Sequence, residues 1–195
     1  MESIFTNIYE TNHWGSNEMA EYRGSSGWGS KYHKEYSDFL RKFIKDNNIN
    51  KIVDLGSGDF VAGEEMYKDM SINYIGYDVY KKVVDYNNEK YKNKYNFIHL
   101  DFYNKKEQLQ SADLCIIKDV LQHWETDEIY NFLDYITNNK LYKYILIINC
   151  CCQTVDDAKI AHQFRTLNCS HFPLKKYNPI KLLNYSTKEI SLIKI

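Results

Sequence analysis

Long apolar runs are missing from this chain of 195 residues, and no stretch approaches the roughly 20 apolar residues of a membrane-spanning helix. The first residues do not combine a basic region with an apolar core, so we expect no secretory signal and a cytoplasmic location. Charge of one sign is also missing, because the formal net charge is -1. A nearly neutral chain has no overall field to attract nucleic acid or an anionic membrane, although a local patch is left open.

A disulfide framework is missing as well. The five cysteines are odd in number, and three of them are adjacent at 150–152, which suits a reducing compartment. A zinc site built from this triplet with His162, Cys169 and His171 would lack the paired spacing, such as C-x-x-C, that zinc sites share. We therefore interpret the cysteines as packed thiols and expect no metal.

Two kinds of phosphate-binding loop are missing from the glycine-containing segment 51–59. A G-x-G-x-x-G loop would need a third glycine where Val61 stands, and G-x-x-x-x-G-K-[ST] does not occur. What the segment has is an apolar run that reaches Asp54 and then a sharp turn at Gly56 and Gly58, where the missing side chains let the backbone approach a ligand. The segment therefore predicts a buried strand that ends in a cofactor loop.

Two further apolar runs end in a carboxylate. The run 73–78 ends at Asp78, twenty residues beyond Gly58, and the run 96–101 ends at Asp101. An acid at the tip of the second strand is where ribose hydroxyls are bound in nucleotide-binding sheets. Taken singly, each aspartate fits a turn or a helix cap equally well. In this order, after the glycine loop, they predict a site for an adenosine-containing cofactor.

The rest of the pattern alternates helices and strands. We expect helices over about 30–47, 61–70, 80–91 and 126–139, further strands over 112–118 and 143–149, and a terminal hairpin at 180–183 and 189–193. Alternating strands and helices imply a parallel sheet, to which the hairpin adds an antiparallel last strand. A chain of this length forms one domain, so we expect a single α/β domain over residues 1–195.

The first thirty residues show neither helical nor strand periodicity, and they contain two clusters of glycine and tryptophan at 12–15 and 24–30. We interpret residues 1–30 as an irregular N-terminal lid segment and residues 31–195 as the cofactor-binding core with a substrate-side C-terminal part. A lid over the cofactor cleft and a flexible arm with its tryptophans tucked into the core explain this composition equally well.

The segment just past the fourth strand, at the edge where such sheets bind ligands, contains Asp119 and His123, which are four residues apart. If a helical turn begins there, the two share a face, and the carboxylate orients the imidazole and raises its basicity. The pair then suits removal of a proton from a hydroxyl group, with His123 as the base and Asp119 orienting it or touching the acceptor. A capping aspartate with a partly exposed histidine, and a divalent ion held by the pair, are the alternatives.

Arg165 and Asn168 follow the fifth strand and can reach the same edge. The guanidinium of Arg165 suits bidentate binding of a phosphate or carboxylate, and a surface arginine explains it equally well.

Residues 53–58 resemble the first motif of the class I S-adenosylmethionine (SAM) dependent methyltransferases. The whole chain resembles a group of small methyltransferases that share an N-terminal Trp-Gly and Ser-Gly-x-Gly-Ser, an Asp-x-Leu-x-His turn after the fourth strand, and a late Arg-x-Leu-Asn before Phe-Pro. In this sequence the motifs are Trp14-Gly15, Ser26 to Ser30, Asp119 to His123, Arg165 to Asn168 and Phe172-Pro173. Asp59 departs from the pattern, because many relatives have a third glycine there.

The resemblance implies a Rossmann-like class I methyltransferase fold, a mostly parallel seven-stranded sheet with an antiparallel last strand and helices on both faces. It implies SAM as the cofactor and S-adenosylhomocysteine (SAH) as its product, with Asp78 at the ribose, Asp101 at the adenine amine and Phe102 beside the base. The residues implied for the cofactor are Asp54, Gly56, Ser57, Gly58, Asp78, Asp101, Phe102, Lys118, Trp14 and Ser30. Those implied for the substrate are Trp28, Arg165 and Asn168.

The likeness further implies O-methylation of a sugar hydroxyl, because such proteins accompany glycan-building genes in bacteria and large DNA viruses. A viral protein would act in the host cytoplasm or the virion. The expected partner is a hydroxyl substrate, either a small molecule such as a nucleotide sugar or a glycan, without nucleic acid or membrane, and a homodimer is left open.

Methylation of RNA or another nucleic acid is the first alternative. Absence of an Asn/Asp-Pro-Pro-Tyr motif after the fourth strand argues against methylation of base amino groups, and the small net charge argues against a long nucleic-acid footprint. An inactive SAM-binding partner subunit is the second alternative.

Overall fold

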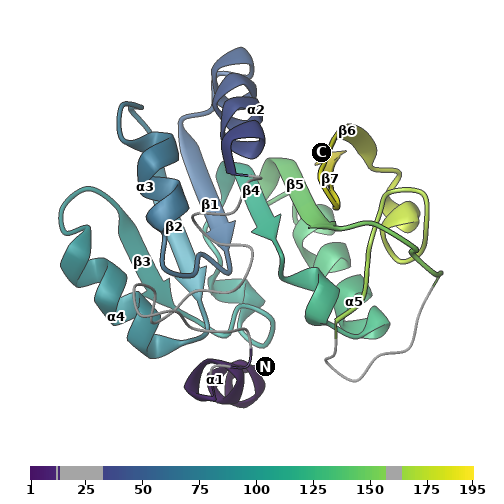
Figure 1. The fold of residues 1–195 in the computed structure, drawn as a ribbon, viewed down its shortest axis with the longest axis horizontal. Coiled ribbons are helices and arrows are strands. Elements are labelled where there is room, and N and C mark those ends of the chain that lie inside the picture. The colour runs from purple at the N-terminus through teal and green to yellow at the C-terminus, as the bar shows by residue number, and fades with distance from the viewer. Residues whose placement is uncertain (12, 14–32, 157–163) are drawn as a thin grey trace. The chain divides into compact units, whose positions relative to one another are not determined.

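The computed structural model describes residues 1–11, 13, 33–156 and 164–195 (Figure 1). The chain divides into two compact units, Met1–Gln108 and Leu109–Ile195. Each unit is built on parallel strands whose carboxyl ends lead into the loops identified from the sequence.

The first unit contains three parallel strands in the order β3-β2-β1, which run side by side in Figure 1. Its elements are α1 (Glu2–Glu10), α2 (His33–Asp46), β1 (Lys51–Leu55), α3 (Val61–Tyr67), β2 (Asn73–Asp78), α4 (Lys81–Lys90), β3 (Asn96–His99) and the 3₁₀ helix η1 (Lys106–Gln108). The central strand β2 is buried along nearly its whole length, as expected for a parallel strand covered on both faces.

Aromatic side chains fill much of the first unit's core. The ring of Phe60 lies 4.5 Å from that of Tyr74 and 5.0 Å from that of Phe97, measured between centroids, and Tyr91 and Tyr95 meet it edge-on. Edge-to-face aromatic contacts are favourable beyond the area they bury. The cluster therefore fixes the start of α3, which directly follows the glycine loop.

The second unit has the strand order β4-β5-β7-β6, with β4 and β5 parallel and both pairs that involve β7 antiparallel. Its elements are β4 (Ala112–Lys118), the 3₁₀ helix η2 (Leu121–His123), α5 (Thr126–Asn138), β5 (Tyr142–Cys150), the 3₁₀ helix η3 (Leu174–Tyr177), β6 (Ile180–Tyr185) and β7 (Lys188–Lys194). A capping box between Glu125 and Glu128 begins α5. The buried face of α5 carries Ile129, Phe132, Leu133 and Ile136.

The expected strands are all present, and the expected runs 73–78 and 112–118 coincide with β2 and β4. The interpretation of the first thirty residues was wrong at its start, because Glu2–Glu10 form the helix α1. Its apolar residues Ile4, Phe5, Ile8 and Tyr9 do recur at helical spacing, and Phe5 is buried. Ser30, expected as the N-cap of the next helix, lies outside the described residues.

Candidate cofactor and catalytic sites

The loop after β1 is held against the end of β2 by backbone hydrogen bonds. The N–H groups of Gly56 and Ser57 both donate to the carbonyl oxygen of Tyr77, at 2.8 and 3.1 Å. Gly56 and Gly58 have φ values of 83° and 55°, in the left-handed region that favours glycine. The glycines predicted from the sequence therefore make the sharp turn expected of them.

Close approach of this loop to β2 depends on Gly76. A Cβ atom at Gly76 would lie 2.9 Å from the Cβ and Oγ atoms of Ser57 and 2.8 Å from a ring carbon of Phe97. Real Cβ atoms essentially never approach other atoms so closely. Gly76 was not among the predicted site residues, because its role depends on the register of β1 against β2.

Asp78, the residue predicted for the ribose, is buried at the tip of β2. Its Oδ2 accepts a hydrogen bond from the N–H of Gly58 at 3.0 Å, and its Oδ1 accepts one from the N–H of Tyr80 at 3.0 Å. Burial raises the pKa of this carboxyl, although the two backbone donors pull the pKa down. A carboxylate has about four acceptor positions, so these bonds leave Asp78 the capacity to accept from ribose hydroxyls.

Asp101, the residue predicted for the adenine amine, is bonded within its own turn and to the start of α1. Its Oδ2 accepts from the side-chain amide of Asn104 at 2.8 Å and from the N–H of Glu2 at 3.1 Å, and its Oδ1 accepts from the N–H of Asn104 at 3.2 Å. Burial raises the pKa of Asp101, but these hydrogen bonds outweigh it and the pKa is lowered. Asp101 therefore caps a turn and also anchors the start of α1.

The other residues predicted for the cofactor within this unit have defined surroundings too. The Oδ2 of Asp54 accepts a hydrogen bond from the hydroxyl of Tyr74 at 2.8 Å, and Phe102 is buried directly after Asp101. Trp14 and Ser30, predicted for the cofactor, and Trp28, predicted for the substrate, lie outside the described residues.

Tyr9 on α1 is a candidate site residue that the sequence analysis missed. Its ring stacks on that of Tyr80 at 4.5 Å with an interplanar angle of 4°. Burial raises the pKa of the Tyr9 hydroxyl well above its usual value, and the negative charges of Asp78 and Asp59 raise it further. α1 therefore brings an aromatic hydroxyl beside the carboxylate that is predicted for the ribose.

Two features of the loop fit an adenosine-containing cofactor. The Oγ of Ser57 is buried and has no hydrogen-bond partner among the described residues, whereas buried polar groups are normally paired. A Cβ atom added at Gly58 would meet no atom within 4 Å. The Ser57 hydroxyl and the Asp78 carboxylate are therefore hydrogen-bonding groups beside an open space at the tips of β1 and β2. This arrangement fits the polar groups of SAM.

Asp119 lies directly after β4 in the second unit. Its φ of 59° is in the left-handed region, and its N–H donates to the carbonyl oxygen of Ile148 at 2.9 Å, one residue beyond the paired part of β4 and β5. Its Oδ2 accepts from the ammonium of Lys118 at 2.5 Å, and its Oδ1 accepts from the ammonium of Lys188. Burial raises the pKa of Asp119, but the two lysines lower it to about 2, so the carboxylate is ionised at neutral pH.

His123 is the last residue of η2. Burial lowers its pKa to about 4, while the charge of Asp119 raises the pKa and that of Lys188 lowers it. The imidazole is therefore unprotonated at neutral pH. Its Nε2 lies 3.4 Å from the side-chain nitrogen of Gln122, and its ring lies 6.1 Å from that of Phe164.

The predicted helical turn that would place Asp119 and His123 on one face is wrong. The left-handed backbone at Asp119 separates it from η2, which begins only at Leu121. Lys188, which the sequence analysis also missed, bonds Asp119 from β7. Only the antiparallel pairing of β7 with β5 reveals this contact, because 69 residues separate the two partners along the chain.

The two residues predicted for the substrate in this unit are tied into its structure. Arg165 is buried, its NH1 donates to the hydroxyl of Thr126 at 2.8 Å, and its backbone N–H donates to the carbonyl oxygen of Gln122 at 3.0 Å. The side-chain oxygen of Asn168 accepts from the N–H of Ser170 at 3.0 Å and pairs with Nδ1 of His171 at 2.8 Å. Arg165 is thus not a surface arginine, and Asn168 shapes the turn that contains it.

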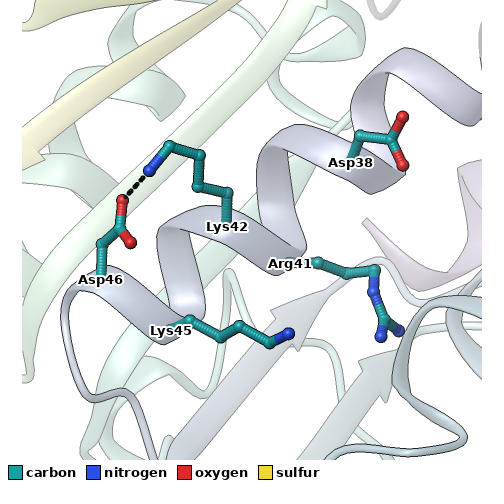
Figure 2. A pocket seen from close by; sticks show the side chains of 5 residues that line it. All are labelled: Asp38, Arg41, Lys42, Lys45 and Asp46. Atoms are coloured by element: carbon teal, nitrogen blue, oxygen red, sulfur yellow. Dashed lines mark hydrogen bonds and ion pairs between the residues drawn. The ribbon is translucent and has the colours of Figure 1, made fainter.

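Figure 2 shows a hollow along the face of α2 that is distinct from these groups. The residues that line it are Asp38, Arg41, Lys42, Lys45 and Asp46. Its charges are largely balanced by ion pairs, Lys42 with Asp46 at 2.5 Å, Lys34 with Asp38 at 2.5 Å and Arg41 with Asp69 at 2.7 Å. Exposed ion pairs of this kind are ordinary features of helix surfaces, so the hollow does not indicate a ligand site.

Within residues 1–11, 13, 33–156 and 164–195, no three His, Cys, Asp or Glu side chains are grouped so that they could hold a metal ion. In the same ranges, no helix has both the length and the apolar character needed to cross a membrane.

Comparison with known structures supports the fold. Magnesium protoporphyrin IX methyltransferase (ChlM) from Synechocystis PCC 6803, solved with bound SAH, shares 15% sequence identity at a TM-score of 0.66, covering 98% of each chain. The methyltransferase domain of bacterial CtHen1 shares 13% identity at a TM-score of 0.65, covering 85% of this chain and 100% of that domain. The mitomycin 7-O-methyltransferase MmcR shares 15% identity at a TM-score of 0.62, covering 86% of this chain and 55% of that one.

Comparison of the sequence with family models identifies the family. The model of the O-methyltransferase domain matches residues 7–172, whereas no curated protein matches the chain. The seven strands with antiparallel β7, together with the structural likenesses, confirm the predicted class I methyltransferase fold. The chain therefore belongs to the O-methyltransferase domain family, and it is a SAM-dependent methyltransferase.

Proposed function

We propose that this protein transfers the methyl group of SAM to a hydroxyl group of a sugar, carried on a nucleotide or in a glycan. The observation that carries the proposal is unprotonated His123 in η2, which follows the ionised Asp119 at the end of β4. An unprotonated imidazole accepts a proton from a hydroxyl group, which is the one proton transfer that O-methylation requires. The sugar rests on the resemblance of the motifs at Trp14-Gly15, Ser26 to Ser30 and Asp119 to His123 to those of small methyltransferases that accompany glycan-building genes.

Within this proposal each group has one task. SAM supplies a methyl group that its sulfonium charge already activates. The loop Gly56 to Gly58 and the tip of β2 would hold the cofactor through the Ser57 hydroxyl and the Asp78 carboxylate. Transfer of that methyl group to the acceptor oxygen would leave SAH as the product. The proton of the hydroxyl passes to an unprotonated ring nitrogen of His123.

The low basicity of His123 is compatible with this task. A sugar hydroxyl is a weak acid in the ground state, but its proton becomes strongly acidic as the oxygen bonds to the methyl carbon. A base that is fully unprotonated at neutral pH and correctly placed is therefore sufficient. Arg165 and Asn168 remain proposals for the substrate side, and in this role Arg165 would complement the negative charge of a nucleotide sugar.

The first test is transfer of labelled methyl from SAM to a panel of nucleotide sugars and glycans, with short RNAs in parallel. Label on a sugar supports the proposal, and label only on RNA moves the function to the nucleic-acid alternative. Tight SAM binding without label on any acceptor would instead indicate an inactive partner subunit.

The second test is the variant His123→Ala. It should bind SAM with unchanged affinity, measured by calorimetry, and lose turnover by about a hundredfold or more, because general-base catalysis contributes about 10²–10⁴-fold. The conservative variant His123→Gln fills the same space without a basic nitrogen, so an equal loss in both variants separates chemistry from packing. Unchanged turnover in His123→Ala removes the assignment of the base.

A further inference from the structure

Lys188 is a buried ammonium group in the second unit. Its side chain is 7% exposed, and it stands on β7 opposite Cys150 of β5. Its Nζ donates to Asp119 Oδ1 and lies 3.7 Å from the sulfur of Cys150. Lysine is almost never buried without a partner, because removing the ammonium group from water is costly.

Asp119 does not need this second lysine to balance its charge. Lys118, its neighbour in sequence, already pairs with Oδ2 at 2.5 Å and is more exposed than Lys188. A buried ion pair contributes little to stability, and apolar residues in its place often give equal stability. We therefore expect Lys188 to have a role other than stabilising the fold.

The contact with Lys188 restricts the orientation of the Asp119 carboxylate. Lys118 and Lys188 hold different oxygens of the carboxylate, from β4 and from β7. The backbone of Asp119 is fixed as well, by its N–H bond to Ile148 and its left-handed φ. Both ends of the side chain are therefore constrained, which is the arrangement expected for a group that must hold one orientation.

His123 lies within the electrostatic reach of this cluster. Asp119 and Lys188 act on the imidazole with opposite signs, the carboxylate favouring a proton on the ring and the ammonium opposing it. Among the described residues, contacts around the cluster bring together Lys118 of β4 with Asp119 at its end, His123 of η2, Cys150 of β5 and Lys188 of β7.

We propose that Lys188 is a positioning residue for the methyl transfer: together with Lys118 it fixes the orientation of the Asp119 carboxylate at the end of β4, and its charge partly offsets that of Asp119. The role rests on the proposed function of His123 as the base. Lys188 itself acts through Asp119 and His123 and does not take part in the proton transfer.

The test compares Lys188→Met with Lys188→Arg, and with Lys181→Met as the matched control. Methionine keeps the length of the side chain and removes its charge, arginine keeps the charge, and Lys181 stands exposed on β6. The first readout is the titration of His123 by NMR of its ring, which does not depend on activity. In Lys188→Met the pKa of His123 should rise by about one unit or more, because the charge of Asp119 is then less compensated. Lys188→Arg and Lys181→Met should leave the titration as in the wild type.

The second readout is the pH profile of turnover on a methyl acceptor. The acidic limb should move upward in Lys188→Met together with the pKa of His123, and turnover at low pH should fall about tenfold for each unit of that shift. The affinity for SAM should stay unchanged. If the role of Lys188 were merely structural, Lys188→Met would lower turnover equally at all pH values. In that case Lys188→Arg would also fail to show the wild-type pH profile.

The outcomes separate this proposal from the proposed function. An unchanged or lowered pKa of His123 in folded Lys188→Met overturns the role of Lys188, whether or not a sugar is methylated. A wild-type protein that methylates no sugar overturns the substrate assignment, and the NMR titration still decides the role of Lys188. If Lys188→Met does not fold, the variant Asp119→Asn replaces it. In Asp119→Asn the pKa of His123 should fall, because the charge of Lys188 is no longer offset by that of Asp119. An unchanged or raised pKa of His123 in this variant would overturn the proposal.

Discussion

At the scale of single residues, Gly76 and Gly63 are two places where one methyl group would be costly. A Cβ atom at Gly76 would press on Ser57 in the cofactor loop, and a Cβ atom at Gly63 would lie 2.2 Å from the ring of Phe60. Both additions overpack the first unit, which costs about 1–3 kcal/mol of stability. Only the addition at Gly76 displaces the cofactor loop directly.

We therefore expect Gly76→Ala to weaken SAM binding by about tenfold or more, while Gly63→Ala loses comparable stability with a smaller effect on affinity. Calorimetric titration with SAM and urea unfolding of both variants measure the two quantities. Equal SAM affinity in Gly76→Ala and the wild type would show that the loop does not depend on its approach to β2.

Some of the site residues could be predicted from the sequence, and others could not. The glycines and Asp78 were predictable because a turn and a strand tip are local features of the chain. The prediction that Asp119 and His123 share a helical face was wrong, because Asp119 has a left-handed backbone that changes the direction of the chain. The spacing of the two residues does not reveal such a conformation. Lys188 was out of reach for a different reason, since its neighbour Asp119 depends on the pairing of β7 with β5.

At the scale of elements, α1 shows how a short helix is held by contacts with the rest of its unit. Phe5 is its buried residue, and the ring of Tyr9 stacks on that of Tyr80. The Tyr80 hydroxyl donates to Glu10 at 2.9 Å, Lys82 pairs with Glu10 at 2.7 Å, and the N–H of Glu2 donates to Asp101. An isolated helix of nine residues is unstable in water, so these contacts are needed for it to form. Its sequence signal was correspondingly short, whereas β2 and β4 were predictable as buried apolar runs bounded by polar residues.

Tyr9→Ala should therefore release α1 from the first unit. We expect hydrogen exchange of the α1 amides to approach that of an unfolded peptide, while the β2 amides keep their protection. The free energy of unfolding should fall by about 1 kcal/mol or more, the contribution of one aromatic stack. Tyr86→Ala, at a partly exposed tyrosine of α4, is the control. Protected α1 amides in Tyr9→Ala would show that the stack does not hold the helix.

At the scale of the whole molecule, the buried titratable groups decide how stability changes with pH. The pKa of His123 is lowered to about 4 and that of Asp119 to about 2, so in both cases the unfolded chain binds the proton more readily than the folded one. Both groups therefore reduce stability as the pH falls, His123 between about 6.5 and 4 and Asp119 below about 3.8. Asp78 acts in the opposite direction, because burial raises its pKa and the folded state then takes up the proton first.

The contribution of His123 can be isolated, because its window lies above that of the carboxylates. Between pH 7 and pH 5 the wild type should lose about 1–2 kcal/mol more unfolding free energy than His123→Gln, which has no group to protonate there. Urea unfolding of both proteins at the two pH values measures this difference, and no labelled acceptor is needed. Parallel losses in the two proteins would mean that His123 titrates in the folded state as it does in the unfolded chain. An imidazole of that kind would be largely protonated at pH 5, and the acidic limb of turnover would then lie near pH 6.5 instead of near pH 4.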